Sequence, residues 1–382
     1  MNARPSDRWA RTTFGRLARI RNGADYSSVE VEAGGYPVFG SGGEFRRAST
    51  FLFDGESVLF GRKGTVDRPL YVSGKFWTVD TMFYSVIDKS RLIPRFAYYW
   101  ATTLPFGEWA TDTALPSMTS TALKAAPIAL PSVPEQRAIA DYLDRETAQI
   151  DAFITKNEEL ITLLTERRSA AAQSEVEHHV GEGSRLKFRL REIDVRAGDE
   201  WAALPLLSVS IHNGVVPRGT YADPSNESSD LSHYKVAQSR DIVLNRMRAF
   251  QGGLGVSPCA GLVSPDYAVL RPTDDVDADW LALVMRTPRF VGEMARRLRG
   301  IGSANSGAVR TPRISVGDLG AILVDFPSSA QQTAELRAVS NSAERIEDAI
   351  SVAQRSVSLA RERRAALISA TVTGKINVGV AT

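Results

Sequence analysis

Residues 132–180 constrain the fold most, because nothing between Pro134 and Gly181 would stop a helix. At a rise of about 1.5 Å per residue, one helix over this stretch would span roughly 70 Å, longer than a compact domain of this size is wide. We therefore expect a helix that joins parts of the chain instead of filling a core. Its apolar residues recur at heptad-like spacing: Ile139, Leu143, Ile150, Phe153, Ile154, Leu160, Ile161 and Leu164.

Both ends of this predicted helix carry signals. Ser132 at the N-cap precedes Glu135 by three residues, which is the spacing of a capping box. Pro134 lies in the first turn, where its missing N–H costs nothing. At the other end Gly181 is available for a left-handed C-cap, so we expect the helix to end near Val180.

The same helix recurs 196 residues later without a gap, as the pair Ser132 and Ser328 shows. Two amphipathic helices with seams in matching register, neither able to bury its stripe alone, should pack on one another. We expect a coiled-coil-like, antiparallel pair and a pseudo-two-fold internal repeat, with Gly374 capping the second helix. Further pairs at this offset are Pro131 and Pro327, Gln136 and Gln332, Ile150 and Ile346, Ile154 and Ile350, Leu163 and Leu359, and Glu166-Arg167-Arg168 and Glu362-Arg363-Arg364.

Strand-rich segments alternate with the two helices. Short apolar or alternating runs lie between glycine-rich turns, and each segment contains an embedded helix, at 95–103 in the first and 278–286 in the second. The predicted fold class is α+β. The expected domains are a first strand-rich domain at 1–130, a helix at 131–180, a second strand-rich domain at 181–326, and a second helix with a tail at 327–382. Within the second domain we expect 201–214 to correspond to 9–23, and 241–244 to 56–59.

Composition excludes several classes of protein. With 382 residues and 43% hydrophobic content, the chain is globular and large enough for two or three domains. No apolar run approaches the length a bilayer needs, and the first residues lack the apolar core of a signal peptide, so a cytoplasmic location is expected. Cys259 stands alone, which excludes an internal disulfide and a cysteine-based zinc site. The histidines, at 178, 179, 212 and 233, show neither HExxH nor a comparable ligand spacing.

The chain resembles the specificity (S) subunit of Type I restriction-modification systems over essentially its whole length. The residues that carry this resemblance enter and close the two helices, and others lie in the second strand-rich domain. They are Leu130-Pro131-Ser132-Val133-Pro134-Glu135-Gln136, then Glu362-Arg363-Arg364-Ala365-Ala366-Leu367-Ile368-Ser369-Ala370 with Val372-Thr373-Gly374-Lys375-Ile376, and also Asn245-Arg246-Met247-Arg248-Ala249-Phe250-Gln251-Gly252 with Ser264-Pro265.

The resemblance implies a non-catalytic subunit without a cofactor of its own. In that family two target recognition domains each read one half of a bipartite DNA site, and the helices fix their spacing. DNA methyltransferase (M) subunits dock on the helical region, and the restriction/translocase (R) subunit joins that assembly. One departure is Gln331, which stands where the family has Glu. Its amide oxygen can still accept from the N-cap backbone, so we expect the capping box of the second helix to survive.

DNA reading needs some side chains that reach base edges and others that hold phosphates. In the second domain, seven arginines and only Glu293 lie between 285 and 313. The alternative for any single arginine is a solvated loop charge. The candidates of the first domain are Ser41, Arg46, Arg47, Arg62, Lys63, Ser117 and Thr119. Those of the second are Asn245, Arg246, Arg248, Gln251, Arg296, Arg297, Arg299, Arg310 and Arg313, the last two expected where Ser117 lies in the first.

Two other functions stay open at this point. One is a coiled-coil assembly scaffold that does not read DNA, and the other is a self-contained nuclease. The sequence has no Walker motif, nucleophile elbow or Asn-Pro-Pro-aromatic methyltransferase motif. Pro265-Asp266 could open a nuclease motif, but no acidic-x-Lys follows at a usable distance. These absences agree with the resemblance, which implies a non-enzymatic DNA-recognition subunit of an adenine-methylating, ATP-dependent restriction complex.

Overall fold

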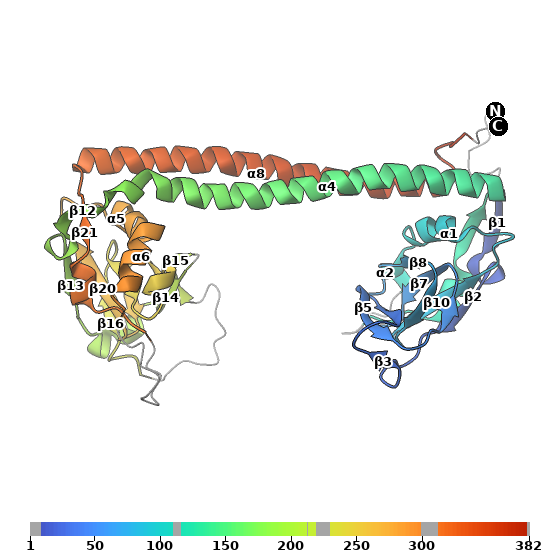
Figure 1. Ribbon diagram of the computed structural model, residues 1–382, viewed down its shortest axis with the longest axis horizontal. Helices are drawn as coiled ribbons and strands as arrows, with labels where there is room; N and C mark the ends of the chain where they lie inside the picture. The colour runs from blue at the N-terminus through green and yellow to red at the C-terminus, as the bar shows by residue number, and fades with distance from the viewer. Residues whose placement is uncertain (1–8, 110–115, 212, 219–229, 299–311, 380–382) are drawn as a thin grey trace. The chain divides into compact units, whose positions relative to one another are not determined.

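The computed structural model describes residues 9–109, 116–211, 213–218, 230–298 and 312–379 (Figure 1). The chain forms two compact units. Unit 1 combines Met1–Glu159 with Ala353–Thr382, and unit 2 is Leu160–Val352. Two long helices therefore contribute residues to both units.

These helices are α4 (Val133–Val176) and α8 (Ser329–Val372), each of 44 residues. Both begin with the predicted capping box. The backbone N–H of Ser132 donates to Glu135 Oε2 at 3.0 Å, and that of Ser328 donates to Gln331 Oε1 at 3.0 Å. Glutamine thus replaces glutamate without loss of the cap, as expected. Gly374 follows α8 with a left-handed φ of +75°.

The end of α4 differs from the prediction. The helix stops at Val176, a 3-10 turn, η3, covers Glu177–His179, and strand β12 begins at Val180. Gly181 has a φ of +100°, but it lies within the strand and does not cap the helix. The reason is tertiary, because Val176 and Val180 are both fully buried in the core of unit 2 and Val180 pairs with β21.

The two helices pack in an antiparallel manner. In unit 1, Arg364 donates to Asp151 at 2.8 Å and Arg361 donates to Glu158 at 2.6 Å. Residue numbers therefore rise along α4 in the direction in which they fall along α8. In unit 2 the same two helices are joined by an ion pair between Arg168 and Glu347. The predicted antiparallel pairing is confirmed.

Unit 1 contains a four-stranded sheet in the order β2-β10-β7-β8, a pair β1-β11, and a five-stranded sheet in the order β3-β5-β4-β9-β6. The strands are β1 Ala10–Thr13, β2 Ala18–Asn22, β3 Glu30–Val31, β4 Tyr36–Gly40, β5 Gly43–Ala48, β6 Phe53–Asp54, β7 Ser57–Gly61, β8 Leu70–Val72, β9 Lys75–Thr78, β10 Met82–Ile87 and β11 Pro127–Leu130. The short helices are η2 Phe14–Arg16, α1 Pro94–Ala101, α2 Phe106–Trp109 and α3 Ser120–Ala125.

Unit 2 contains a four-stranded sheet in the order β13-β20-β17-β18 and the pairs β12-β21, β14-β15 and β16-β19. Its strands are β12 Val180–Arg185, β13 Leu190–Ile193, β14 Leu207–Ser210, β15 Gly214–Pro217, β16 Lys235–Ala237, β17 Ile242–Asn245, β18 Leu254–Val256, β19 Gly261–Val263, β20 Tyr267–Pro272 and β21 Leu323–Val324. Its short helices are η4 Leu186–Phe188, η5 Gly198–Ala203, η8 Ala249–Gln251, α5 Ala278–Met285, α6 Pro288–Arg296 and α7 Val316–Gly320.

The two strand-rich lobes repeat one topology. In each, an outer pair of strands leads through a 3-10 turn into the first strand of the four-stranded sheet. The backbone N–H of Phe14 donates to Ala126 O at 3.0 Å, and that of Leu186 donates to Ile322 O at 2.9 Å, so η2 and η4 are equivalent. As expected, β17 corresponds to β7, and α5 corresponds to α1.

The predicted correspondence of 201–214 with 9–23 is wrong. The counterpart of 9–23 is the segment from β12 to β13, which starts directly after η3. Trp201 instead lies in η5, and β14 pairs with β15 in an antiparallel manner.

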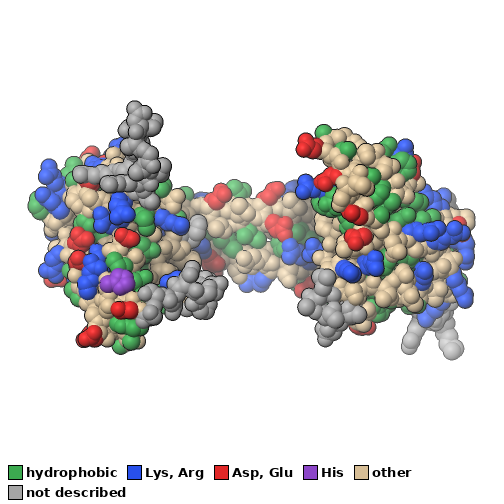
Figure 2. Space-filling model, turned by 90° about the horizontal axis from the view of Figure 1, so that it is seen from below, with side chains coloured by type: hydrophobic (Ala, Val, Ile, Leu, Met, Phe, Trp, Pro, Cys, Tyr) green, Lys and Arg blue, Asp and Glu red, His purple; other side chains and the backbone are tan. Residues whose placement is uncertain are grey.

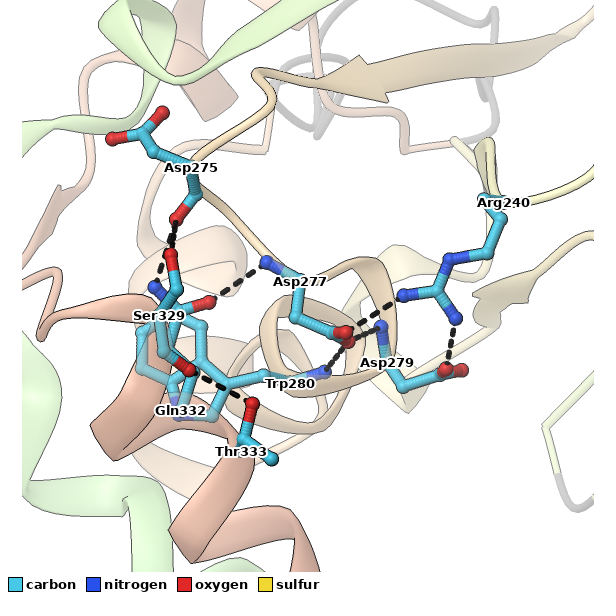
Figure 3. A network of polar contacts seen from close by, with 8 residues as sticks. All are labelled: Arg240, Asp275, Asp277, Asp279, Trp280, Ser329, Gln332 and Thr333. Atoms are coloured by element: carbon cyan, nitrogen blue, oxygen red, sulfur yellow. Dashed lines mark hydrogen bonds and ion pairs between the residues drawn. The ribbon is translucent and has the colours of Figure 1, made fainter.

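Glutamine residues join each lobe to its long helix by the same hydrogen bonds. In unit 2, Gln332 Oε1 accepts from the N–H of Asp277 at 2.7 Å, while Nε2 donates to Asp275 O at 3.1 Å and to Pro327 O at 2.9 Å (Figure 3). Arg240 pairs with Asp277 and Asp279 beside this contact (Figure 3). The segment that enters α5 is thereby tied to the first turn of α8.

In unit 1, Gln136 Oε1 accepts from Ile93 N at 2.7 Å, and its Nε2 donates to Arg91 O and Pro131 O, both at 2.9 Å. Both glutamines are fully buried. Each amide spends its acceptor and both donor protons on backbone groups, which is what a buried amide needs.

A second contact in unit 1 holds α1 against α4. Asp144 of α4 accepts from the hydroxyl of Tyr99 at 2.5 Å and pairs with Arg95 at 2.7 Å. Burial raises the pKa of Tyr99 to about 12, and the hydrogen bond to Asp144 adds to this effect. The apolar core continues from this point through Leu143 of α4 to Ile368 of α8.

Candidate nucleic-acid interface

In each lobe, the loop after one central strand of the four-stranded sheet is hydrogen-bonded to the segment that precedes a short helix. The strands are β7 and β17, and the helices are α3 and α7. In unit 1 the N–H of Met118 donates to Arg62 O at 2.9 Å, and in unit 2 the N–H of Ile314 donates to Arg246 O at 3.2 Å. The residue before each donor is Ser117 in unit 1 and Arg313 in unit 2. The predicted equivalence of Arg313 with Ser117 is therefore confirmed.

The first lobe brings four of its candidates together at this loop. Lys63 forms a β-bridge with Ser117 and is exposed, whereas Arg62 donates to Asp80 O at 3.3 Å. Thr119 is the N-cap of α3, where its side chain accepts from Ala122 N at 3.1 Å. The lysine is thus the cation presented to solvent, and the hydroxyl of Thr119 stabilises a helix.

The other three candidates of the first lobe lie on the β4-β5 hairpin of the five-stranded sheet. Ser41 is in the turn, and Arg46 pairs with Glu30 at 3.2 Å with its side chain 59% exposed. Arg47 donates to Gly34 O at 2.7 Å as well as to Gly35 O and Glu44. Arg47 therefore fixes a glycine turn, whereas Arg46 stays accessible beside an open groove of about 890 Å³.

In the second lobe, Asn245 is buried at the end of β17. Its Oδ1 accepts from Met247 N at 3.2 Å and its Nδ2 donates to Tyr267 Oη at 3.4 Å, so the amide shapes the turn. Arg246 donates from Nε to Ile314 O at 3.0 Å, which leaves its two terminal nitrogens for another acceptor. Arg248 is exposed, and Arg313 lies 3.9 Å from Asp266.

Two further arginines of this lobe lie at the end of α6. Arg296 and Arg297 both pair with Glu293, and the hydrogen bond from Arg297 is the main reason that the pKa of Glu293 is lowered. The side chain of Arg296 is 76% exposed. Arg299 and Arg310 lie outside the described residues.

Gln251 faces a groove of about 880 Å³ within unit 2. Arg286 and the α4 residues Arg168 and Gln173 line the same groove. Arg286 donates to Ile211 O at 2.5 Å, and burial lowers its pKa. Arg286 belongs to the arginine-rich run at 285–313 but was not among the candidates. No residue near it in the sequence indicates that α4 forms the other side of this groove.

Lys and Arg side chains also appear on the face of each lobe that is turned away from its long helices (Figure 2). Cations on such a face supply the non-specific part of DNA affinity, because they displace counterions from phosphates. Among the described residues, no helix is long and apolar enough to cross a membrane.

Residues 7–162 match the family model described as the Type I restriction modification DNA specificity domain. This match covers the first lobe and the first part of α4, which are therefore similar to the specificity domain of that family. No curated protein matches the chain. A domain of this family provides the DNA specificity of a Type I restriction-modification system.

Solved structures of specificity subunits share the fold. A structure that addresses complex assembly and conformational transition of the type I R-M system is 13% identical, with a TM-score of 0.66, 96% of this chain covered and 98% of that chain. The HsdS subunit from Thermoanaerobacter tengcongensis is 15% identical, with a TM-score of 0.52, 96% of this chain covered and 97% of that chain. At such identity the likeness concerns the arrangement of helices and strands.

Proposed function

We propose that this chain reads a bipartite DNA target, one half-site per lobe, and holds the methyltransferase and restriction subunits of a Type I complex. The observation that carries the proposal is the repetition of the four-stranded sheet in the same order, with the same glutamine contact to a long helix. A chain that contains two copies of a DNA-reading module can contact two separate sequence elements.

Within each lobe, the loop at 62–63 or 246–248 carries the reading residues. Lys63 and Arg248 are exposed. Arg246 uses Nε for its backbone contact, so its two terminal nitrogens would be the groups that recognise guanine or phosphate. Arg46 and Arg313 contribute phosphate contacts from neighbouring segments. Arg47, Thr119 and Asn245 act indirectly, because their polar groups hold the turns and the helix that present these cations.

Exposed leucines at repeat-related positions suit the docking of two methyltransferase subunits. Leu163 of α4 is 61% exposed and Leu359 of α8 is 64% exposed. Large apolar side chains kept on the surface at both positions favour protein contacts. In this proposal the partners bind the methyl donor and ATP, this chain performs no chemistry, and the complex acts on cellular DNA in the cytoplasm.

Methylome sequencing of cells that express the chain with its methyltransferase partner tests the proposal. The expected result is a motif of two specified parts separated by an unspecified gap. Unmethylated DNA despite a formed complex would favour an assembly scaffold instead.

The lobe assignment needs a variant. Arg246→Ala with Arg248→Ala should change one half of the motif and leave the other intact, because both residues lie in one lobe. Arg191→Ala, an exposed arginine on edge strand β13 of that lobe, is the matched control and should leave the motif unchanged. Equal changes in both halves would contradict the assignment.

A further inference from the structure

The end of α4 and the start of α8 place two histidines and a glutamate together in unit 2. His178, His179 and Glu335 each offer a ligand atom, and these atoms all lie within 4.8 Å of one another. The imidazole rings of His178 and His179 have their centroids 3.9 Å apart. His179 is 4% exposed, and its Nε2 lies 3.1 Å from Glu335 Oε1. We propose that these three side chains bind a divalent transition-metal ion, with Zn²⁺ as the best match.

The donor set fits the metal. Zinc takes imidazole nitrogen and carboxylate oxygen at about 2.0–2.2 Å, and three protein ligands with water in the fourth position are a common arrangement. Such bonds place tetrahedral ligand atoms roughly 3.3 Å apart. The ligand atoms of His179 and Glu335 are already about this far apart, at 3.1 Å. Only the side chain of His178 would have to move closer for all three to bind one ion. His178 is exposed and lies in the short η3 turn, where its side chain can rotate.

Surrounding groups orient two of the ligands. Trp280 Nε1–H donates to Glu335 Oε2 at 2.7 Å, which fixes the carboxylate. The second ring nitrogen of His179, Nδ1, is buried without a hydrogen bond and lies 3.7 Å from Asp325 Oδ2. A metal-bound histidine typically donates its other ring N–H to a carboxylate, and the 63% exposed side chain of Asp325 could make that hydrogen bond after a small movement.

The repeat shows that the fold does not require these polar groups. The positions equivalent to Glu335 and Trp280 in unit 1 are Ile139 and Phe96, both buried in its apolar core. The same helix contact is therefore made there by two hydrocarbon side chains. Unit 2 instead keeps the carboxylate of Glu335 against the buried imidazole of His179. A buried carboxylate is costly unless a positive charge accompanies it, and a bound cation would supply that charge. The metal would fasten η3, where α4 ends, to α8.

The test uses the full chain without a polyhistidine tag, titrated with Zn²⁺ by calorimetry and with Co²⁺ by visible absorption. We expect one ion per chain, and a rise in the melting temperature when Zn²⁺ is present. His178→Ala and Glu335→Gln should each weaken binding at least tenfold. Glu335→Gln keeps an acceptor for Trp280, so its fold is preserved. His233→Ala, an exposed histidine elsewhere in unit 2, should bind as the wild type does.

Glu335→Ile provides a second, fold-preserving variant, because it copies the residue of unit 1. It should fold and fail to bind the ion. The proposal is overturned if the wild type shows no saturable binding near one ion per chain. It is also overturned if His178→Ala and Glu335→Gln bind as tightly as the wild type, or if His233→Ala loses binding to the same extent.

Discussion

Gln136 and Gln332 lie 196 residues apart and make the same three hydrogen bonds, each to the start of a short helix and to the proline that precedes a long one. Each amide accepts one backbone N–H and donates to two backbone carbonyls. Three satisfied bonds contribute about 0.5–1.5 kcal/mol each, whereas an orphaned buried partner costs about 1–3 kcal/mol. Replacing either glutamine should therefore lower the free energy of unfolding by more than the net contribution of its hydrogen bonds.

Gln332→Ala should lower the free energy of unfolding of unit 2 by about 1–3 kcal/mol, because the N–H of Asp277 loses its buried partner, while the carbonyl of Asp275 still accepts from Ser329. Denaturant unfolding gives the magnitude, and hydrogen exchange at residues 275–285 locates it. Gln354→Ala, an exposed glutamine on the same helix, is the control and should change stability by less than about 0.5 kcal/mol. Equal losses in the two variants would show that the contact is unimportant.

Gln331→Glu should stabilise α8. The capping contacts stay in place, since Glu135 makes the same contacts at 3.0 and 2.9 Å in the first copy. A carboxylate in the first turn also interacts favourably with the helix dipole, by about 0.3–1 kcal/mol. Thermal unfolding at low ionic strength should show a higher melting temperature, and the gain should shrink in high salt. A gain that does not depend on salt would contradict the electrostatic explanation.

The raised pKa of Tyr99 leads us to expect that the folded chain loses stability at alkaline pH. This pKa is raised to about 12 in the folded chain, against about 10 in an unfolded one, because burial disfavours the phenolate. A raised pKa means that this stabilisation is complete below pH 10 and is lost as the pH rises to 12. Over that window the wild type should lose up to roughly 2–3 kcal/mol from this group.

Tyr99→Phe checks this assignment. At pH 7 the variant should be less stable by about 1–2 kcal/mol, because the hydrogen bond to Asp144 is gone. Between pH 10 and 12 its unfolding free energy should fall less steeply than that of the wild type. Tyr142→Phe on α4 controls for the loss of a phenol. Parallel curves for wild type and Tyr99→Phe would exclude Tyr99 as the titrating group.

Leu163→Asp and Leu359→Asp should each remove one methyltransferase subunit from the complex, and the double variant should remove both. An exposed helix position tolerates aspartate at about 0.7 kcal/mol, so folding survives while an apolar contact is lost. Native mass spectrometry of the purified complex counts the subunits. Phe188→Asp, 65% exposed in the second lobe, is the control for a surface charge. Full occupancy in the double variant would move the docking site elsewhere.

The helices and their caps could be predicted because their signals are local. Ser132, Glu135 and Gly374 act within one turn of the chain, and the 196-residue repeat allows each helix to support the other's assignment. The end of α4 could not be predicted in this way. Val180 pairs with Val324, 144 residues away, and no property of the residues near Gly181 reveals that partner.

The candidate site follows the same rule. The approximate location of Lys63, Arg246 and Arg248 in loops after strands was predictable from glycine turns and charge. Which cations are exposed was not, since Arg47 is held by the carbonyl oxygens of Gly34 and Gly35 and Arg297 by Glu293. The cluster of His179 with Glu335 was also invisible, because its members are 156 residues apart.

Unit 1 is completed by the last part of α8, so its two segments are made at different times during synthesis. Leu160–Val352 contains everything that unit 2 needs, so it can close as soon as it leaves the ribosome. The part of unit 1 that is made earlier has most of its core but lacks the last part of α8. Until Ile368 and Val372 emerge, the apolar side chains of Ile139 and Leu143 have no helix to cover them. During synthesis the apolar face of α4 in unit 1 is therefore exposed until the end of α8 has been made, and a chaperone can bind it there.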